Sequence, residues 1–171
     1  MESPYFVNPA GFTIHSAIHS AREDAQCVLH LHTDDGVAVS AQKDGLQAIT
    51  QQSMLLTSQV AYHDYEGVAL DLDERERLVA DIGDKKLMVL RNHGTLAVGE
   101  NCALAFIAMY FLERACTAQI RAMAGELNRP SQAALDTTAE QSKTLFGPGV
   151  DALAWPALLR KLDRLDPSYR D

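Results

Sequence analysis

The sequence predicts a domain of mixed α/β class, and three patterns along its 171 residues support this. Apolar residues recur at helical spacing in several segments, short alternating or apolar runs between them are typical of strands, and the second half contains a long apolar helical stretch. The two kinds of segment alternate without a repeat or a linker, as in domains that pack helices on a sheet. The length is that of one ordinary domain. We therefore expect residues 1–171 to form one domain with one core.

The first helix and the first strand are indicated by two different periodicities. In residues 13–21 the apolar side chains fall at i, i+3, i+4 and i+7, which predicts a short amphipathic helix. Residues 27–33 instead alternate, so a strand there would place Val28, His30 and His32 on one face. The two histidines of this segment are therefore expected to lie side by side.

Capping residues, turn residues and apolar runs place the later elements. Asp34 and Asp35 are expected to cap the helix that follows the first strand, because short acidic side chains accept hydrogen bonds from free helical N–H groups. The remaining expected elements are helices over 37–42 and 51–58, mixed strand and turn over 60–67, a charged helix capped by Asp71 or Asp73 and ending near Gly83, a buried strand over 86–90, a long helix over 101–125, a weaker helix over 131–143, a turn at 147–150 and a last helix over 156–165.

Charge and composition exclude several classes of partner. The formal net charge is −8, the wrong sign for binding nucleic-acid phosphates or an anionic lipid surface. The longest apolar run, residues 102–112, is shorter than the roughly 20 residues of a membrane span, so no membrane segment and a cytoplasmic location are expected. Cys27, Cys102 and Cys116 show no CxxC spacing, and buried reduced thiols are the simplest interpretation.

Three histidines form the most informative constellation. On a strand, His30 and His32 would have Cα atoms about 6.5–7 Å apart, close enough for two imidazoles to reach one ion. The competing interpretation is a partly buried, hydrogen-bonded pair. His93 favours the metal, because it directly follows an apolar strand and a polar residue at a strand end is well placed to face a cleft. Three histidines can hold a metal that keeps a coordination position open.

The neighbours of His93 and the histidines of the first helix have simpler interpretations. Gly94 would permit a tight turn after the strand, and Asn92 could hydrogen-bond the backbone or a substrate. His15 and His19 are four residues apart, a spacing that can chelate zinc, but they lack the HExxH pattern of metalloproteases. Structural hydrogen bonding is favoured for both, with His15 nearer the site.

Three further residues have plain structural interpretations. Glu113 and Arg114 lie on the long helix, where an interface salt bridge or a solvated face is favoured. Trp155, the only tryptophan, is expected to be a core or interface anchor.

The sequence resembles the class II aldolase and adducin family, in particular its adducin-like branch. The resemblance runs from Val7 to the end of the chain and is carried by the segments VNPAGFTIHSAIHSARED, CVLHLHT, VAYHDYEG, LRNHGTLAVGE and LERACTAQI. It implies a three-layer α/β/α class II aldolase-like domain with a mixed, largely antiparallel central sheet, assembled as a homotetramer with active sites near subunit interfaces. It also implies that His30, His32 and His93 hold a divalent ion that polarises a carbonyl group of a small-molecule substrate.

Two positions depart from the family's catalytic pattern. The acid/base glutamate upstream of the HxH strand falls on Gly11, and the downstream tyrosine supplied by a neighbouring subunit falls near Gln51. Glu66, in the polar segment with His63 and Tyr65, is the carboxylate that we nominate as a substitute base, although a surface turn is the favoured interpretation of this segment. The family's phosphate-binding segment normally lies before the region where this sequence begins, so the N-terminal part of the family domain is expected to be absent.

Three functions remain open at this point. The first is a metal-dependent lyase of aldolase type that acts on a small carbonyl or hydroxy-acid substrate, with zinc as the default metal and manganese, cobalt or iron as alternatives. The second is a non-catalytic adducin-like domain for assembly or binding, which Gly11 favours. The third is a non-haem iron oxygenase or decarboxylase on the same three histidines.

Overall fold

The computed structural model describes residues 4–145 and 149–170, so residues 147 and 148 of the expected turn lie outside the described residues. Four strands form one sheet in the order β1-β4-β3-β2. They are β1 (Cys27–Leu31), β2 (Val60–His63), β3 (Leu87–Leu90) and β4 (Gly94–Gly99). β4 is antiparallel to β1 and β3, whereas β2 is parallel to β3. The predicted α/β class and the mixed, largely antiparallel sheet are confirmed.

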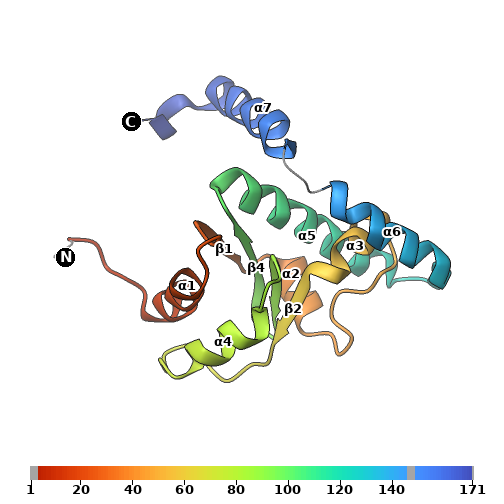
Figure 1. Ribbon diagram of the computed structural model, residues 1–171, viewed down its shortest axis with the longest axis horizontal. Coiled ribbons are helices and arrows are strands. Elements are labelled where there is room, and N and C mark those ends of the chain that lie inside the picture. The colour runs from red at the N-terminus through yellow and green to blue at the C-terminus, as the bar shows by residue number, and fades with distance from the viewer. Residues whose placement is uncertain (1–3, 146–148, 171) are drawn as a thin grey trace.

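Helices cover both faces of this sheet (Figure 1). One face carries α1 (Pro9–Ala21) and α4 (Glu74–Ile82), and the other carries α2 (Asp34–Ser40), α3 (Gln51–Leu56) and α5 (Cys102–Ala122). Each interface has its own cluster of buried apolar side chains, so the single core expected from the length is divided in two by the sheet. Strand alternation sorts the residues: Leu96 faces α1 and α4, and its neighbour Ala97 faces α5. The three-layer α/β/α architecture is confirmed.

Helices α1 and α2 begin earlier than expected because of their capping residues. α1 starts at Pro9 because the Asn8 side chain accepts a hydrogen bond from the Ala10 N–H, and proline suits the first helical turn. α2 is capped by Thr33, whose Oγ1 accepts from the Gly36 N–H at 3.1 Å. The expected caps, Asp34 and Asp35, instead occupy the first turn of α2, where their charge complements the helix dipole.

Strand β4 is the element that the sequence analysis missed. Every residue of Gly94–Gly99 is buried, so the strand shows no polar and apolar alternation, and glycine stands at both of its ends. A short run that is buried throughout is hard to assign by periodicity alone. β4 nevertheless occupies the centre of the sheet next to β1, and it fixes the position of the first strand relative to β3.

The long helix α5 is apolar because it is a core helix of this sheet. By length and composition Cys102–Ala122 would be long enough to cross a membrane, but it packs on β4, α2 and α3.

The later elements are α6 (Gln132–Leu145), which contacts α3, and α7 (Val150–Leu165), which lies at the edge of the molecule (Figure 1). α7 begins six residues before the expected start and contains Pro156. Trp155 anchors it, with its ring 5.7 Å from that of Phe106 on α5. Two short 3-10 helices, η1 (Thr57–Gln59) and η2 (Pro167–Arg170), complete the described structure.

Candidate metal centre

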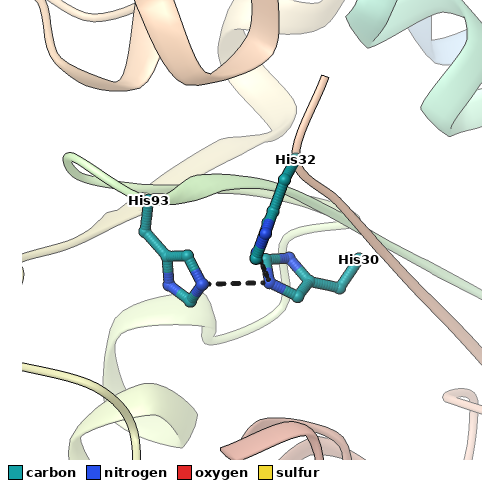
Figure 2. A group of neighbouring side chains, drawn as sticks. All are labelled: His30, His32 and His93. Atoms are coloured by element: carbon teal, nitrogen blue, oxygen red, sulfur yellow. Dashed lines mark hydrogen bonds between the residues drawn. The ribbon is translucent and has the colours of Figure 1, made fainter. Parts of the chain in front are cut away.

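The end of β1 and the β3–β4 hairpin bring His30, His32 and His93 together (Figure 2). His30 is the fourth residue of β1, His32 follows the strand directly, and His93 lies in the turn between β3 and β4. The ring centroids are 4.6 to 4.8 Å apart, and the three imidazoles converge on one point. The predicted association of these three histidines is therefore confirmed as a geometric fact.

The hairpin that carries His93 is tight and is held by backbone hydrogen bonds. Asn92 has a positive φ of 56°, a conformation that asparagine tolerates better than most residues, and its N–H donates to the Ser40 carbonyl. The His93 N–H donates to the Leu90 carbonyl and to Ser40 Oγ. A Cβ on Gly94 would lie 2.4 Å from the Leu31 carbonyl oxygen and 3.0 Å from His32 Cδ2. Asn92 and Gly94 thus shape the turn, and a substrate contact of either stays a prediction.

Two of the three spacings between the ligand atoms match those found around one bound cation. His30 Nε2 lies 2.8 Å from His32 Nε2 and 3.3 Å from His93 Nε2, and the three ligand atoms all lie within 4.8 Å of one another. Nitrogens bonded to one ion at about 2.1 Å are about 3.0 Å apart in octahedral and about 3.4 Å apart in tetrahedral geometry. Both contacts also have the geometry of imidazole N–H···N hydrogen bonds in which the free Nε2 of His30 accepts, so the same arrangement holds the three rings together without an ion and places their ligand atoms for one.

The orientation and charge state of the histidines also suit metal binding. The His30 Nδ1–H donates to the Thr95 carbonyl at 2.9 Å, which fixes the tautomer that leaves Nε2 free. Burial lowers the pKa of His30 to about 4, against the opposing effect of the Thr95 hydrogen bond, and burial likewise lowers the pKa of His93. Both imidazoles are therefore neutral at pH 7, and neutral imidazole is the form that coordinates metals.

The other histidine pair lies on α1 and is tied to the backbone. His19 donates through Nδ1 to the Ala25 carbonyl at 2.6 Å, as expected of a structural histidine. His15 is half-buried and close enough to His30 to lower its pKa, which confirms that His15 is the nearer of the two. Burial, followed by the His19 charge, lowers the pKa of His15.

The two positions that depart from the family's pattern offer no acid or base. Gly11 lies one turn before His15 on α1, and a Cβ there would have only the Asn8 Cβ nearby, at 3.9 Å. Gln51 is the exposed first residue of α3, a helix on the other face of the sheet. The face of α1 beside His15 therefore carries no side chain at the position where the family's pattern has a carboxylate.

Two residues of the polar segment, Glu66 and His63, lie in different surroundings. Glu66 is exposed and bound by the Arg77 guanidinium, with one contact of 2.7 Å to Oε1, and this hydrogen bond lowers the pKa of Glu66. A lowered pKa weakens a carboxylate as a base, and the proposed catalytic role of Glu66 stays a prediction. His63 is buried between Glu74 and Asp81 of α4, so the surface-turn interpretation is wrong for this residue.

Glu113 is the residue near the site that the sequence analysis misjudged. It was expected on a solvated face or in a salt bridge, but the carboxylate is half-buried and accepts hydrogen bonds from Thr33 Oγ1 and Thr95 Oγ1. A signal was present, because Glu113 shares the helical stripe of buried Met109 and Cys116, at i−4 and i+3. Arg114, its neighbour, is exposed.

Two other features lie away from the histidines. A cavity of about 270 Å³, lined mainly by apolar side chains of α3, α5 and the sheet, includes Leu87 and Val98. These residues stand at the opposite ends of β3 and β4 from the His93 turn. Among the cysteines, Cys116 is buried as expected, Cys27 is half-buried and Cys102 is exposed.

Residues 2–120 match the family model described as the class II aldolase and adducin N-terminal domain. The chain belongs to the class II aldolase and adducin family. A solved aldolase II superfamily protein from Pseudomonas syringae is 52% identical with a TM-score of 0.91, over 96% of this chain and 67% of that one. A Caulobacter vibrioides protein, named for aldolase class 2 with no substrate stated, is 56% identical over 99% of this chain and 67% of its own length. The chain thus spans about two thirds of these two relatives.

More distant members of the family point in two functional directions. Alpha-adducin of Rattus norvegicus is 47% identical over 119 residues, which are 69% of this chain and 16% of the adducin. The L-fuculose 1-phosphate aldolase of Glaciozyma antarctica PI12 is 31% identical with a TM-score of 0.67, over 80% of this chain and 52% of the enzyme. The chain is therefore similar both to an adducin and to an aldolase, and the aldolase shares its fold.

Proposed function

We propose that the chain is a divalent-metal-dependent enzyme of lyase type that acts on a small carbonyl or hydroxy-acid substrate. The convergence of three imidazole Nε2 atoms within 4.8 Å is the observation that carries this proposal. Family membership supports it, because an aldolase of known substrate class shares the fold at 31% identity. Zinc is the proposed metal, since nitrogen ligands suit it, with manganese, cobalt and iron as the alternatives.

Residues of this chain would hold the cation and leave it accessible to a substrate. A divalent cation bound by His30, His32 and His93 would act as a Lewis acid for a substrate oxygen. His32 is exposed whereas His30 and His93 are half-buried, so the cluster is reached from one side by solvent and by a small molecule. The Thr95 carbonyl keeps His30 in one orientation throughout.

A second candidate function, a non-catalytic adducin-like domain, is favoured by one specific observation. The position of the family's acid/base glutamate carries no side chain at Gly11, and the nominated substitute Glu66 is engaged by Arg77. Such a domain would keep the fold for assembly or partner binding. A measurable turnover that requires the three histidines would exclude this alternative.

Metal analysis of the purified protein tests the proposed centre. We expect about one divalent ion per chain by elemental analysis, and none in the variant in which His30, His32 and His93 are all replaced by alanine. His19→Ala, which removes a histidine bonded only to the Ala25 carbonyl, is the matched control and should keep the metal. Metal at wild-type stoichiometry in the triple variant would show that the ion binds elsewhere.

We also propose that the chain assembles into a symmetric homotetramer, as its resemblance to the class II aldolases implies. Large apolar side chains near the start of the chain support self-association, because Phe6 is 87% and Phe12 is 51% exposed. Light scattering at micromolar concentrations should give the mass of four chains. A strictly monomeric particle across that range would contradict the proposal and weaken the expectation that a neighbour completes the site.

A further inference from the structure

Glu113 carries a half-buried carboxylate that has no basic partner among the described residues. In residues 4–145 and 149–170, no lysine, arginine or histidine lies within ion-pair distance of it. Its two oxygens instead accept hydrogen bonds from the hydroxyl groups of Thr33 and Thr95, the latter at 2.5 Å. A half-buried carboxylate held only by neutral donors keeps its negative charge uncompensated.

Each of these two threonines is directly connected to a residue of the histidine cluster. Thr33 follows His32 in the chain and caps α2, so the position of its hydroxyl fixes the backbone just after His32. Thr95 lies on β4, and its carbonyl accepts the Nδ1–H of His30. One carboxylate on α5 therefore bonds both segments that determine how His30 and His32 are presented.

The register of the sheet places the Glu113 carboxylate on the face of the sheet that is opposite the histidine cluster. Thr95 pairs with Leu31 of β1 and Val89 of β3, and Val89 packs in the α5-side apolar cluster. Residues that pair across strands point to the same face, so the Thr95 side chain points toward α5, away from the histidines. The space is tight, because a Cβ on Gly36 would lie 2.7 Å from Thr33 Oγ1 and 2.9 Å from Glu113 Oε1. Glu113 thus has little freedom to move from its two hydroxyl partners.

We propose that Glu113 is a positioning residue of the metal centre, which holds the His32–Thr33 and Thr95 segments in the geometry that binds the cation. This inference rests on the proposed metal centre. Groups that orient the ligands of a metal site typically change its affinity by 10–100-fold when removed. The negative charge of Glu113 also favours a cation on the other side of the sheet.

The test compares two carboxylates at the same helix interface. Asp35, on the first turn of α2, accepts a hydrogen bond from Thr117 Oγ1 of α5 at 2.6 Å, so Asp35→Asn removes a charge from the same α2–α5 contact without touching Thr33 or Thr95. Zinc affinity is measured on the full chain by competition with a chromophoric chelator. We expect Glu113→Gln to weaken zinc binding about 10-fold or more, and Asp35→Asn to change it less than about twofold.

A second variant and a spectroscopic readout separate positioning from general destabilisation. Thr95→Val keeps the carbonyl that binds His30 and the shape of the side chain but removes the hydroxyl bond to Glu113, so it should weaken zinc binding in the same direction. The visible spectrum of the cobalt-loaded protein should change in Glu113→Gln and Thr95→Val and stay the same in Asp35→Asn, because it reports ligand geometry. Circular dichroism of the metal-free variants verifies the fold.

The outcomes of this experiment are distinct from those of the metal analysis. A wild-type chain that binds no zinc would remove the proposed metal centre and, with it, this role of Glu113. If the wild-type chain binds zinc and Glu113→Gln binds it equally well with an unchanged cobalt spectrum, the positioning role is wrong and the metal centre stands. Equal losses in Glu113→Gln and Asp35→Asn would also overturn the proposal, because they would show an effect of charge alone.

Discussion

Two histidine environments lie on the same face of the sheet, and they differ in what surrounds the rings. His63 of β2 points at α4, where Nδ1 lies 2.7 Å from Asp81 Oδ2 and Nε2 lies 3.3 Å from Glu74 Oε1. His30 and its two partners face one another, and the group contains no carboxylate. Both nitrogens of His63 are thus engaged by carboxylates, whereas the Nε2 atoms of the cluster lie against one another (Figure 2). The surroundings of a histidine, more than its place on the sheet, decide whether it serves as an ion-pair partner or as a metal ligand.

The largest effect that this comparison predicts concerns catalysis, because neither environment offers a free base. Glu74 and Asp81 are engaged with His63, and Glu66 with Arg77. General acid/base catalysis typically contributes about 10²–10⁴-fold, so we expect retro-aldol cleavage of fuculose- or ribulose-type sugar phosphates to be slower than in an aldolase with its acid/base groups by at least this factor. Coupled assays with added zinc or manganese measure it.

Fast cleavage of a sugar phosphate would contradict the prediction that no base is available. Turnover of about one per second, an ordinary value for an enzyme, would show that another residue moves the proton. Glu66→Gln would then identify the base directly, since Glu66 is the carboxylate nominated from the sequence. Loss of that turnover in Glu66→Gln, with unchanged metal content, would also exclude the non-catalytic alternative.

The second prediction tests whether the two histidine environments are independent. His63→Ala removes the partner of Glu74, whose side chain is 9% exposed, and leaves a buried carboxylate unpaired. Breaking a buried pair in this way typically costs about 3–5 kcal/mol, so the free energy of unfolding in urea should fall by about that amount. Zinc affinity of the folded protein should change little, because His63 does not contact the cluster.

A double variant provides the control for this prediction. Replacing His63 and Glu74 together by leucine removes both polar side chains and should cost less stability than His63→Ala, because Glu74 no longer leaves an unpaired carboxylate. A His63→Ala protein that keeps wild-type stability would show that Glu74 is solvated in solution. Loss of zinc binding in a folded His63→Ala protein would show instead that the two environments form one site.

The sequence predicted the grouping of the three histidines better than it predicted the residues that support this group. His30 and His32 share a face because of strand alternation, and His93 follows an apolar strand, so local patterns suffice for all three. The burial of His63 and the placement of Glu113 depend on which helix packs on which strand, which local patterns do not encode. Strand β4, whose carbonyl at Thr95 orients His30, is wholly buried and lacks the alternation that would have shown it. Its absence from the predicted elements left the strand order open.

The smallest predicted effect is on the free energy of unfolding, and it compares the buried His63–Glu74 pair with the more exposed ion pairs of Asp24. Asp24 accepts hydrogen bonds from Arg22 Nη2 at 2.7 Å and from Lys86 Nζ at 2.5 Å, and these bonds hold the pKa of its carboxyl well below the ordinary 3.8. Its side chain is 38% exposed, against 4% for His63, so solvent screens the interaction. Asp24→Asn should therefore lower the free energy of unfolding by less than about 1 kcal/mol.

The dependence of this difference on pH and salt follows from the lowered pKa of Asp24. A carboxyl whose pKa is lower in the folded state contributes its stability above the ordinary pKa of 3.8 and loses it as the pH falls through the lowered value. The difference between wild type and Asp24→Asn should thus be constant from neutral pH down to about pH 5, and should shrink below about pH 4. In 1 M salt it should shrink at neutral pH as well, because the screening length is then about 3 Å.

The matched control is Glu140→Gln, which breaks an ion pair to Lys143 in which the glutamate side chain is 74% exposed. This variant should have no measurable effect on the free energy of unfolding. A loss for Asp24→Asn as large as that for His63→Ala would show that burial does not separate the two pairs, because the exposed interaction would then be as strong as the buried one.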